Sequence, residues 1–375
     1  MQVNKGRTRL IKVLVTCSLL MASIPQAVQF GEAYAAGTSA STTVSVTDLQ
    51  QKLLNAMTSR SEQLNFTYKG PVVGLKEKLQ RAIAQAMESD PYINYTIKSY
   101  AFSYKGTSTS ANVSVTLRYR ETKAETAYVD QIVHSVLKQI VKPGMSSDEK
   151  VKAIHDWIVA HLKYDTTLQK YTAYDGLKTG STVCQGYSLL AYKMLKQAGI
   201  PNRIVEGRAG GQLHAWNLVQ LNGVWYHLDT TWDDPVPDQG KQISRNYYLL
   251  TDAEIRRDHS WTKSYPHAVT PYRQTLAGLI ASDKAKASIY KKMYDELDYR
   301  LYDASEIVST SAKLKTKAQA AMADGQSSMV IRFRGSQSQL AARLQDLYQL
   351  GLHSISYHVI PFKNTSDLRV SIKWT

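Results

Sequence analysis

A cysteine, a histidine and an aspartate in the middle of the chain are of the types that perform nucleophilic chemistry together. Cys184 is one of two cysteines, and His214 and Asp229 follow it in the sequence. The thiolate is the reactive form of cysteine, and a base that is itself oriented by a carboxylate activates it. These residues predict cysteine-dependent chemistry, provided that the fold brings them together. The alternative for Cys184 is a buried structural cysteine.

The sequence STVCQGYSLLAYKMLKQAGIP predicts a helix with Cys184 in its first turn. Apolar residues recur at helical spacing from 187 to 198, and Gly199 is a stop signal. We expect the hydroxyl of Ser181 or Thr182 to cap the start of this helix.

The first turn of a helix favours the chemistry of a thiolate. Its backbone N–H groups and the positive end of the helix dipole stabilise negative charge, so we expect Cys184 to ionise below the free-thiol value of about 8.5. The same N–H groups can hold the oxyanion that forms when a thiolate attacks a carbonyl. Gly186 is expected to let another segment approach the helix closely.

Asn222-Gly223 stands between two runs of alternating residues, LHAWNLVQL and VWYHLDTTW, and predicts a two-residue hairpin turn. The resulting register places Trp216 opposite Asp229. His214 and Asp229 then share one sheet face as diagonal neighbours, about 7–8 Å apart between backbones. An imidazole N–H can reach a carboxylate from there. In this role Asp229→Asn is expected to lower activity with little effect on stability.

Other residues of the same region have structural interpretations. His227 lies on the same hairpin face and raises the alternative of a metal site with His214 and Asp229. Zinc usually requires three or four convergent ligands with partners of their own, and no fourth ligand is evident. We therefore expect no metal and no cofactor. Trp216 is interpreted as core or as a wall that excludes water, and His155, on an apolar helix stripe, as a hydrogen-bonded core histidine.

Three stretches occur in a fixed order between about residues 146 and 235, and they are IHDWIVAHLKYD, TVCQGYSLLAYKMLKQAGIPNRIVEG and HAWNLVQLNGVWYHLDTTWDDP. Together they resemble the core of the transglutaminase-like superfamily. The resemblance implies a papain-like core, in which a helix that carries the cysteine packs on an antiparallel β-sheet. It also implies Cys184 as nucleophile, His214 as base and Asp229 as the residue that orients the base.

The chain also departs from animal transglutaminases. Their tryptophan-rich cysteine motif and flanking domains have no counterpart in the sequence, and no run of acidic residues resembles a calcium loop. Cross-linking is therefore not implied, because the superfamily includes peptidases, amidases and inactive members. Candidates for a second oxyanion donor or for substrate contact are Tyr164, Trp157, Gln185 and Trp216.

Residues 1–35 have the features of a secretory signal peptide. A basic start precedes a short apolar run at 13–22, and a small-x-small cleavage site occupies 33–35. Cleavage would remove Cys17 and leave Cys184 without a partner for an internal disulfide. No later segment reaches the roughly 18 apolar residues of a membrane span. We expect a secreted protein, in which an association with the cell wall is open.

The charge of the chain bears on its partners. The formal net charge is +15, and removal of the signal segment, with its four basic residues and Glu32, leaves about +12. Such a charge suits an anionic cell-wall polymer, and export argues against nucleic acid. A merely basic soluble protein is the alternative.

Outside the core, two stretches share the order strand, helix, strand, strand. We therefore expect an α+β protein in which two small β-α-β-β modules flank the papain-like core. The expected ranges are 1–35 for the signal peptide, 36–45 for a disordered leader, 46–128 for the N-terminal module, 129–272 for the core, 273–326 for a helical linker and 327–375 for the C-terminal module.

The predicted function is acyl chemistry on amide bonds through a cysteine nucleophile, with hydrolysis ahead of cross-linking. The expected substrate is a protein at the cell surface or a cell-wall peptide. A non-catalytic binding or scaffold module that keeps the fold is the alternative, and a structural zinc protein is a third. A scaffold needs none of the residues Cys184, His214 and Asp229, so their presence favours the enzyme.

Overall fold

We describe a computed structural model of the chain. The described residues are 42–43, 46–234, 243–362 and 365–375. The expected signal peptide and almost all of the expected leader lie outside them. The chain divides into two compact units, residues 1–269 and 270–375, and each is described by itself. Among the described residues, no helix is both long and apolar enough to cross a membrane.

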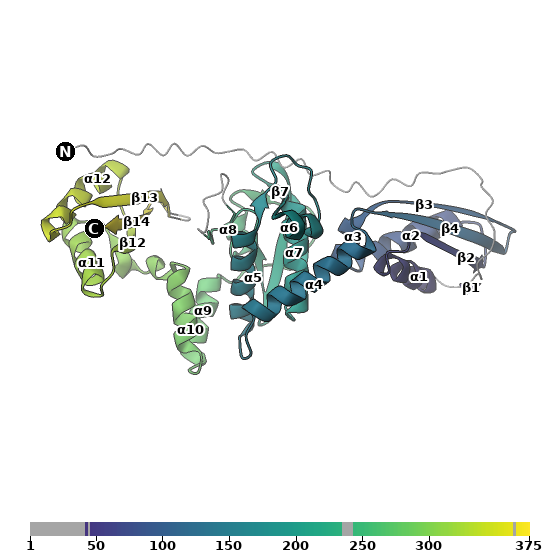
Figure 1. The fold of residues 1–375 in the computed structure, drawn as a ribbon, viewed down its shortest axis with the longest axis horizontal. Coiled ribbons are helices and arrows are strands. Elements are labelled where there is room, and N and C mark those ends of the chain that lie inside the picture. Colours follow the sequence, from purple (N-terminus) through teal and green to yellow (C-terminus); the bar gives the residue numbers. More distant parts are fainter. Residues whose placement is uncertain (1–41, 44–45, 235–242, 363–364) are drawn as a thin grey trace. The chain divides into compact units, whose positions relative to one another are not determined.

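The first unit begins with a small module in which two helices cover one face of a four-stranded sheet (Figure 1). Its elements are β1 (Thr42–Thr43), α1 (Val46–Thr58), β2 (Gln63–Lys69), α2 (Leu75–Glu88), β3 (Ile97–Gly106) and β4 (Ser110–Tyr119). The strand order is β1-β2-β4-β3, with β1 parallel to β2 and the other neighbours antiparallel. Apolar residues at helical and alternating spacing form its core, among them Leu53, Leu79 and Val115.

The core that follows is built around a four-stranded antiparallel sheet with the order β10-β7-β8-β9. Its elements are α3 (Pro91–Thr96), α4 (Lys123–Ile140), α5 (Ser147–His161), β5 (Lys163–Tyr164), α6 (Ala173–Thr179), β6 (Ser181–Thr182), α7 (Cys184–Gln197), β7 (Asn202–Ala209), β8 (Gln212–Leu221), β9 (Val224–Leu228), α8 (Asp252–Ile255) and β10 (His259–Ser260). Helix α7 packs on β7 and β8, which is the arrangement of a cysteine-bearing helix on an antiparallel sheet. The expected boundary at 128 falls inside α4.

Local sequence signals set the start of α5 and the β8–β9 hairpin. Ser146 and Glu149 form the capping box of α5. Asn222 and Gly223 both have positive φ, 50° and 83°, as a type I′ turn requires. Strand β9 then ends at residue 228, so Asp229 is the first residue beyond the ladder.

The second unit ends with a module of the same kind. The elements of this unit before the module are α9 (Tyr272–Ser282), α10 (Ala287–Glu296), η1 (Tyr299–Tyr302) and η2 (Ala304–Glu306). The module itself consists of β11 (Ile307–Val308), α11 (Ser311–Ala323), β12 (Ser328–Phe333), α12 (Gln337–Gln345), η3 (Asp346–Leu350), β13 (Ile355–Pro361) and β14 (Leu368–Trp374). The sheet order is β11-β12-β14-β13, with β11 parallel to β12 and the other neighbours antiparallel.

The two modules share one topology, strand by strand, including an initial strand and helix that the expected β-α-β-β order lacks. Residues 307–323, assigned from the sequence to a linker, therefore belong to the C-terminal module. A two-residue strand has no detectable periodicity, which is why sequence patterns missed β1 and β11. Gly70 and Gly335 follow equivalent strands with φ of 144° and 147°, a conformation that glycine tolerates and other residues avoid.

Candidate active site

Cys184 is the first residue of α7, and no side chain caps this helix, whose N-cap is Val183. The expected cap by Ser181 or Thr182 is wrong, because Ser181 and Thr182 form strand β6 instead. The Thr182 hydroxyl donates to the carbonyl of Lys170 at 3.0 Å. No side chain at the N-cap therefore accepts a hydrogen bond from the first-turn N–H groups.

Gly186 lies where two other segments press against the first turn of α7. A Cβ atom at this position would stand 1.9 Å from Thr182 Oγ1 and 2.7 Å from the carbonyl oxygen of Thr172. Both atoms are held by a hydrogen bond between them, 3.3 Å long, so neither can move away freely. The expectation that Gly186 permits a close approach is confirmed.

We predict that Gly186→Ala lowers the free energy of unfolding by about 1–3 kcal/mol, the usual cost of overpacking. Chemical denaturation measures this cost. Gly278→Ala is the control, because Gly278 lies in helix α9 with no atom near its Cβ position. That variant should be neutral or more stable by up to about 1 kcal/mol. Equal stabilities of the two variants would contradict the close approach.

Helix α7 and strand β8 are joined next to the candidate residues. Ser188 Oγ lies 2.8 Å from the carbonyl oxygen of Cys184 and 2.8 Å from that of Ala215. Leu213 packs against Cys184, whose side chain is fully buried. The residues on both sides of His214 are therefore in contact with the first two turns of α7.

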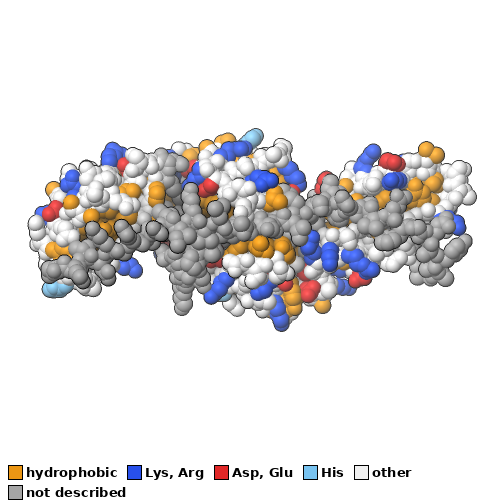
Figure 2. All heavy atoms as spheres, turned by 90° about the horizontal axis from the view of Figure 1, so that it is seen from above, with side chains coloured by type: hydrophobic (Ala, Val, Ile, Leu, Met, Phe, Trp, Pro, Cys, Tyr) orange, Lys and Arg blue, Asp and Glu red, His pale blue; other side chains and the backbone are white. Residues whose placement is uncertain are grey.

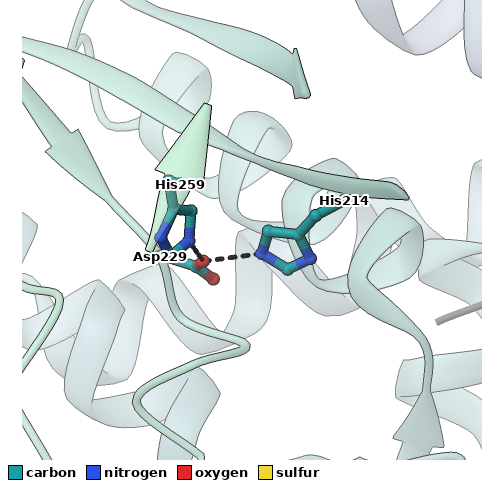
Figure 3. A group of neighbouring side chains, drawn as sticks. All are labelled: His214, Asp229 and His259. Atoms are coloured by element: carbon teal, nitrogen blue, oxygen red, sulfur yellow. Dashed lines mark hydrogen bonds and ion pairs between the residues drawn. The ribbon is translucent and has the colours of Figure 1, made fainter. Parts of the chain in front are cut away.

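His214 and Asp229 are hydrogen-bonded, as the hairpin register predicts (Figure 3). His214 Nε2 lies 2.6 Å from Asp229 Oδ2, and both side chains are buried. Asp229 Oδ1 accepts hydrogen bonds from the backbone N–H groups of Thr231, at 3.0 Å, and Trp232, at 3.1 Å. The carboxylate is thus oriented by the backbone on one oxygen and faces the imidazole with the other.

The electrostatics of Asp229 favour its ionised form. Burial by itself raises the pKa of this carboxyl. The positive charge and hydrogen bonds of His214 and His259 outweigh burial and hold the pKa of Asp229 well below its ordinary value.

His259 is a member of this group that sequence reasoning missed. It lies in β10, which pairs with the edge of β7, and its Nε2 is 3.0 Å from the same Oδ2 atom of Asp229 (Figure 3). Each of His214, Asp229 and His259 has one atom that could bind a metal ion, a ring nitrogen or a carboxylate oxygen. These atoms lie within 4.8 Å of one another. A two-residue strand carries no pattern, so the only signal was the presence of a histidine beside an aspartate in the stretch RRDHSW.

His227, considered from the sequence as a third metal ligand, has other partners. Its Nδ1 accepts a hydrogen bond of 2.9 Å from Trp216 Nε1, and its Nε2 lies 2.9 Å from Asp252 Oδ1. Burial, the largest influence, keeps the pKa of His227 below its ordinary value. His259 therefore stands beside Asp229 where His227 was expected.

Two tryptophans contact the ring of His214. Trp216 is buried and stacks on it, with 5.7 Å between ring centroids and an interplanar angle of 17°. Trp232 approaches at 6.1 Å. Trp216 is thus a buried core residue that also lies against the ring of His214, so the packing is consistent with both of its interpretations.

Three remaining candidates have contacts that point to different roles. Gln185 is buried, and its side-chain amide N–H donates to the carbonyl of Tyr95 in α3, at 3.4 Å. This hydrogen bond joins α7 to α3. Tyr164 pairs with Thr182 between β5 and β6, close in sequence to Cys184. The ring of Trp157 stacks on His161 of its own helix, with 4.3 Å between centroids.

His155 is a hydrogen-bonded core histidine, as expected. It is fully buried, its Nδ1 lies 3.0 Å from Asp156 Oδ1, and its Nε2 lies 3.0 Å from Asp233 Oδ2. Burial lowers the pKa of His155, but hydrogen bonds and charges from the two carboxylates outweigh it and the net direction is upward.

Comparison with known proteins supports the relationship that the motifs indicate. Residues 134–230 match the model of the transglutaminase-like superfamily. Kyphoscoliosis peptidase of Homo sapiens is 29% identical over 145 residues, which cover 33% of this chain and 21% of that protein. Its Mus musculus counterpart is 29% identical over 141 residues, 32% of this chain and 21% of that protein. The chain thus spans about a fifth of the length of these curated relatives.

Among solved structures, one described as a TGase aligns with 18% identity over 45% of this chain and 51% of that chain, with a TM-score of 0.27. The family match covers the segment that contains the cysteine, histidine and aspartate described above. Residues 134–230 are therefore similar to the transglutaminase-like superfamily, and Cys184, His214 and Asp229 lie within this segment.

Proposed function

We propose that this chain is an exported cysteine-dependent amide hydrolase that acts on a protein or peptide at the cell surface. One observation carries the proposal. His214, hydrogen-bonded to Asp229 at 2.6 Å, is flanked in its strand by residues that contact the first turns of the helix that begins with Cys184.

The geometry supports a chemical sequence with a separate role for each residue. Because His214 Nε2 faces Asp229, proton exchange with the thiol and with the leaving amine falls to Nδ1. The Cys184 thiolate attacks the amide carbon, and first-turn N–H groups receive the oxyanion. His214 then protonates the departing amine, and an acyl-enzyme remains.

Water completes the reaction. His214 takes a proton from the water that attacks the thioester, and the products are a carboxylic acid and the free thiol. Asp229 stabilises the imidazolium that forms in each step, and its low pKa keeps it ionised throughout. The buried ring of Trp216 and the partly buried ring of Trp232 lie against His214 and limit access of bulk water to it.

The cellular location and substrate are part of the proposal. The signal-peptide features of residues 1–35 support export, and the net charge of about +12 that remains without this segment suits contact with an anionic wall polymer. Figure 2 shows Lys and Arg side chains spread over the face that it draws, not gathered in one patch. A diffuse positive charge of this kind fits a loose association with a surface.

We predict that hydrolysis of a peptide amide outruns transfer to an amine, and that neither needs calcium. The assay offers the substrate with and without excess primary amine, in chelator and in millimolar calcium, and Cys184→Ala is the control. Release of free acid, insensitive to chelator, is the expected result. Dominant calcium-dependent incorporation of the amine would instead assign the protein to the cross-linking enzymes.

A further inference from the structure

Asp229 is hydrogen-bonded to two imidazoles, and the proposed chemistry uses only one of them. His259 Nε2 lies 3.0 Å from Asp229 Oδ2, and His259 Nδ1 lies 2.6 Å from Asp258 Oδ1. The imidazole of His259 is fully buried. It therefore bridges two carboxylates, one of which also orients the proposed base.

The two hydrogen bonds determine the charge of His259. A neutral imidazole donates from one nitrogen and accepts at the other, whereas the imidazolium donates from both. An ionised carboxylate only accepts, so two carboxylates on opposite nitrogens require the imidazolium. Burial raises the pKa of Asp258, but hydrogen bonds from His259 and Tyr247 outweigh it, and the pKa lies below its ordinary value. Asp229 is likewise held in its ionised form.

A cation in this position acts on His214 through Asp229. Both imidazoles share the single atom Asp229 Oδ2, and the centroids of their rings are 5.5 Å apart. The positive charge of His259 partly neutralises the Asp229 carboxylate, which therefore stabilises a protonated His214 less. The same charge also repels the positive charge of protonated His214 directly. His214 thus gives up its proton more readily, which a general acid for amine departure requires near neutral pH.

We propose that His259, held in its charged form by Asp258, is a positioning residue that orients Asp229 and lowers the pH at which His214 loses its proton. The inference rests on the proposed function, because it concerns the same base. Among the described residues, the ionisable groups that interact with His259 include Asp229, Asp258, His214, His227 and Tyr247. Arg257 lies against Asp258 and Tyr247.

His259→Gln tests the role of the charge, since glutamine keeps an N–H donor for Asp229 and carries no charge. In this variant the alkaline limb of the kcat/KM profile should move upward by about one pH unit, the size expected for one charge at this distance in a partly screened site. Asp258→Asn should move the limb in the same direction, because His259 is then no longer held as a donor on both nitrogens.

His155→Gln is the matched control. His155 is equally buried and also bridges two carboxylates, Asp156 and Asp233, but it shares no hydrogen bond with Asp229 among the contacts described above. This variant should be less stable than the wild-type protein, and the alkaline limb of its kcat/KM profile should stay at the wild-type pH. A shift of the limb equal to that of His259→Gln would reduce the effect to a general loss of packing, and the proposal would be wrong.

A second readout separates this inference from the proposed function. Nuclear magnetic resonance of protein labelled with 15N-histidine follows the titration of His214 directly, with His214→Gln as the assignment control. An upward shift in His259→Gln supports the inference even where no amide is hydrolysed. If His214 titrates identically in the wild-type protein, in His259→Gln and in Asp258→Asn, the inference is wrong, whatever the activity. A metal ion retained after dialysis and needed for activity would also overturn it, by assigning the cluster to that ion.

Discussion

Cys184→Ala is expected to lower the kcat/KM for peptide amide hydrolysis by about 10⁵-fold. Alanine has no nucleophile, whereas the His214–Asp229 hydrogen bond and the first-turn N–H groups remain. Only the residual catalysis from binding and oxyanion stabilisation should survive. The fold should be retained, because a buried cysteine behaves as a small apolar residue and the change removes a single sulfur atom.

The measurement pairs steady-state kinetics with thermal unfolding of the same preparations. Ser188→Ala is a useful companion, because it removes the hydroxyl that joins the carbonyls of Cys184 and Ala215 and leaves the nucleophile in place. It should lower activity far less than Cys184→Ala does. Activity of Cys184→Ala within tenfold of wild type would exclude Cys184 as the nucleophile.

Asp229→Asn is expected to lower kcat by about 10³–10⁴-fold and also to cost stability. The catalytic loss follows because an uncharged amide cannot stabilise the imidazolium of His214. The sequence led us to expect little effect on stability, and the structure changes that expectation. The carboxylate is fully buried and accepts hydrogen bonds from two imidazoles and two backbone N–H groups. Leaving such groups poorly paired costs about 1–3 kcal/mol.

Asp233→Asn is the control for the stability effect. Asp233 is also buried and is hydrogen-bonded to His155 and to the backbone N–H of Tyr247, but it is not part of the proposed chemistry. It should lose comparable stability and keep kcat within about tenfold. Equal losses of kcat in the two variants would show that Asp229 acts through the fold alone.

The pH dependence of stability provides a further check on Asp229. Its pKa is lowered in the folded protein, and an unfolded aspartate titrates near about 3.9. Its contribution is therefore fully present above about pH 4 and is lost as the pH falls through the folded value. The difference in unfolding free energy between wild type and Asp229→Asn should narrow below about pH 4. A constant difference would contradict the assigned charge.

The local parts of the site could be predicted from the sequence, for a physical reason. Asn222-Gly223 allows one tight turn, and a two-residue turn leaves a single register for the strands that it joins. His214 and Asp229 are therefore neighbours by covalent connection and strand geometry alone. The helix after Cys184 follows equally from the spacing of its apolar residues, which become its buried face.

Only the tertiary structure decided the contacts between segments that are distant in sequence. From the sequence, the Thr182 hydroxyl could cap the start of α7 or hydrogen-bond elsewhere. In the structure it donates to the carbonyl of Lys170, which the packing of that segment brings close. The sequence did not reveal that the side-chain amide of Gln185 donates to the carbonyl of Tyr95, which α3 places beside it. In both cases the polar side chain could form a hydrogen bond with any of several partners. The sequence does not reveal which partner the fold brings next to it.

His259 is the strongest case of this kind. Its strand β10 has two residues, too few for any periodicity, and its place is set by pairing with the edge of β7. The sequence by itself determined the helix that begins with Cys184, the hairpin and the pairing of His214 with Asp229, because each depends on local geometry. The tertiary structure alone determined that the Asp229 carboxylate serves a second histidine, because long-range packing, and not chain connectivity, brings His259 to it.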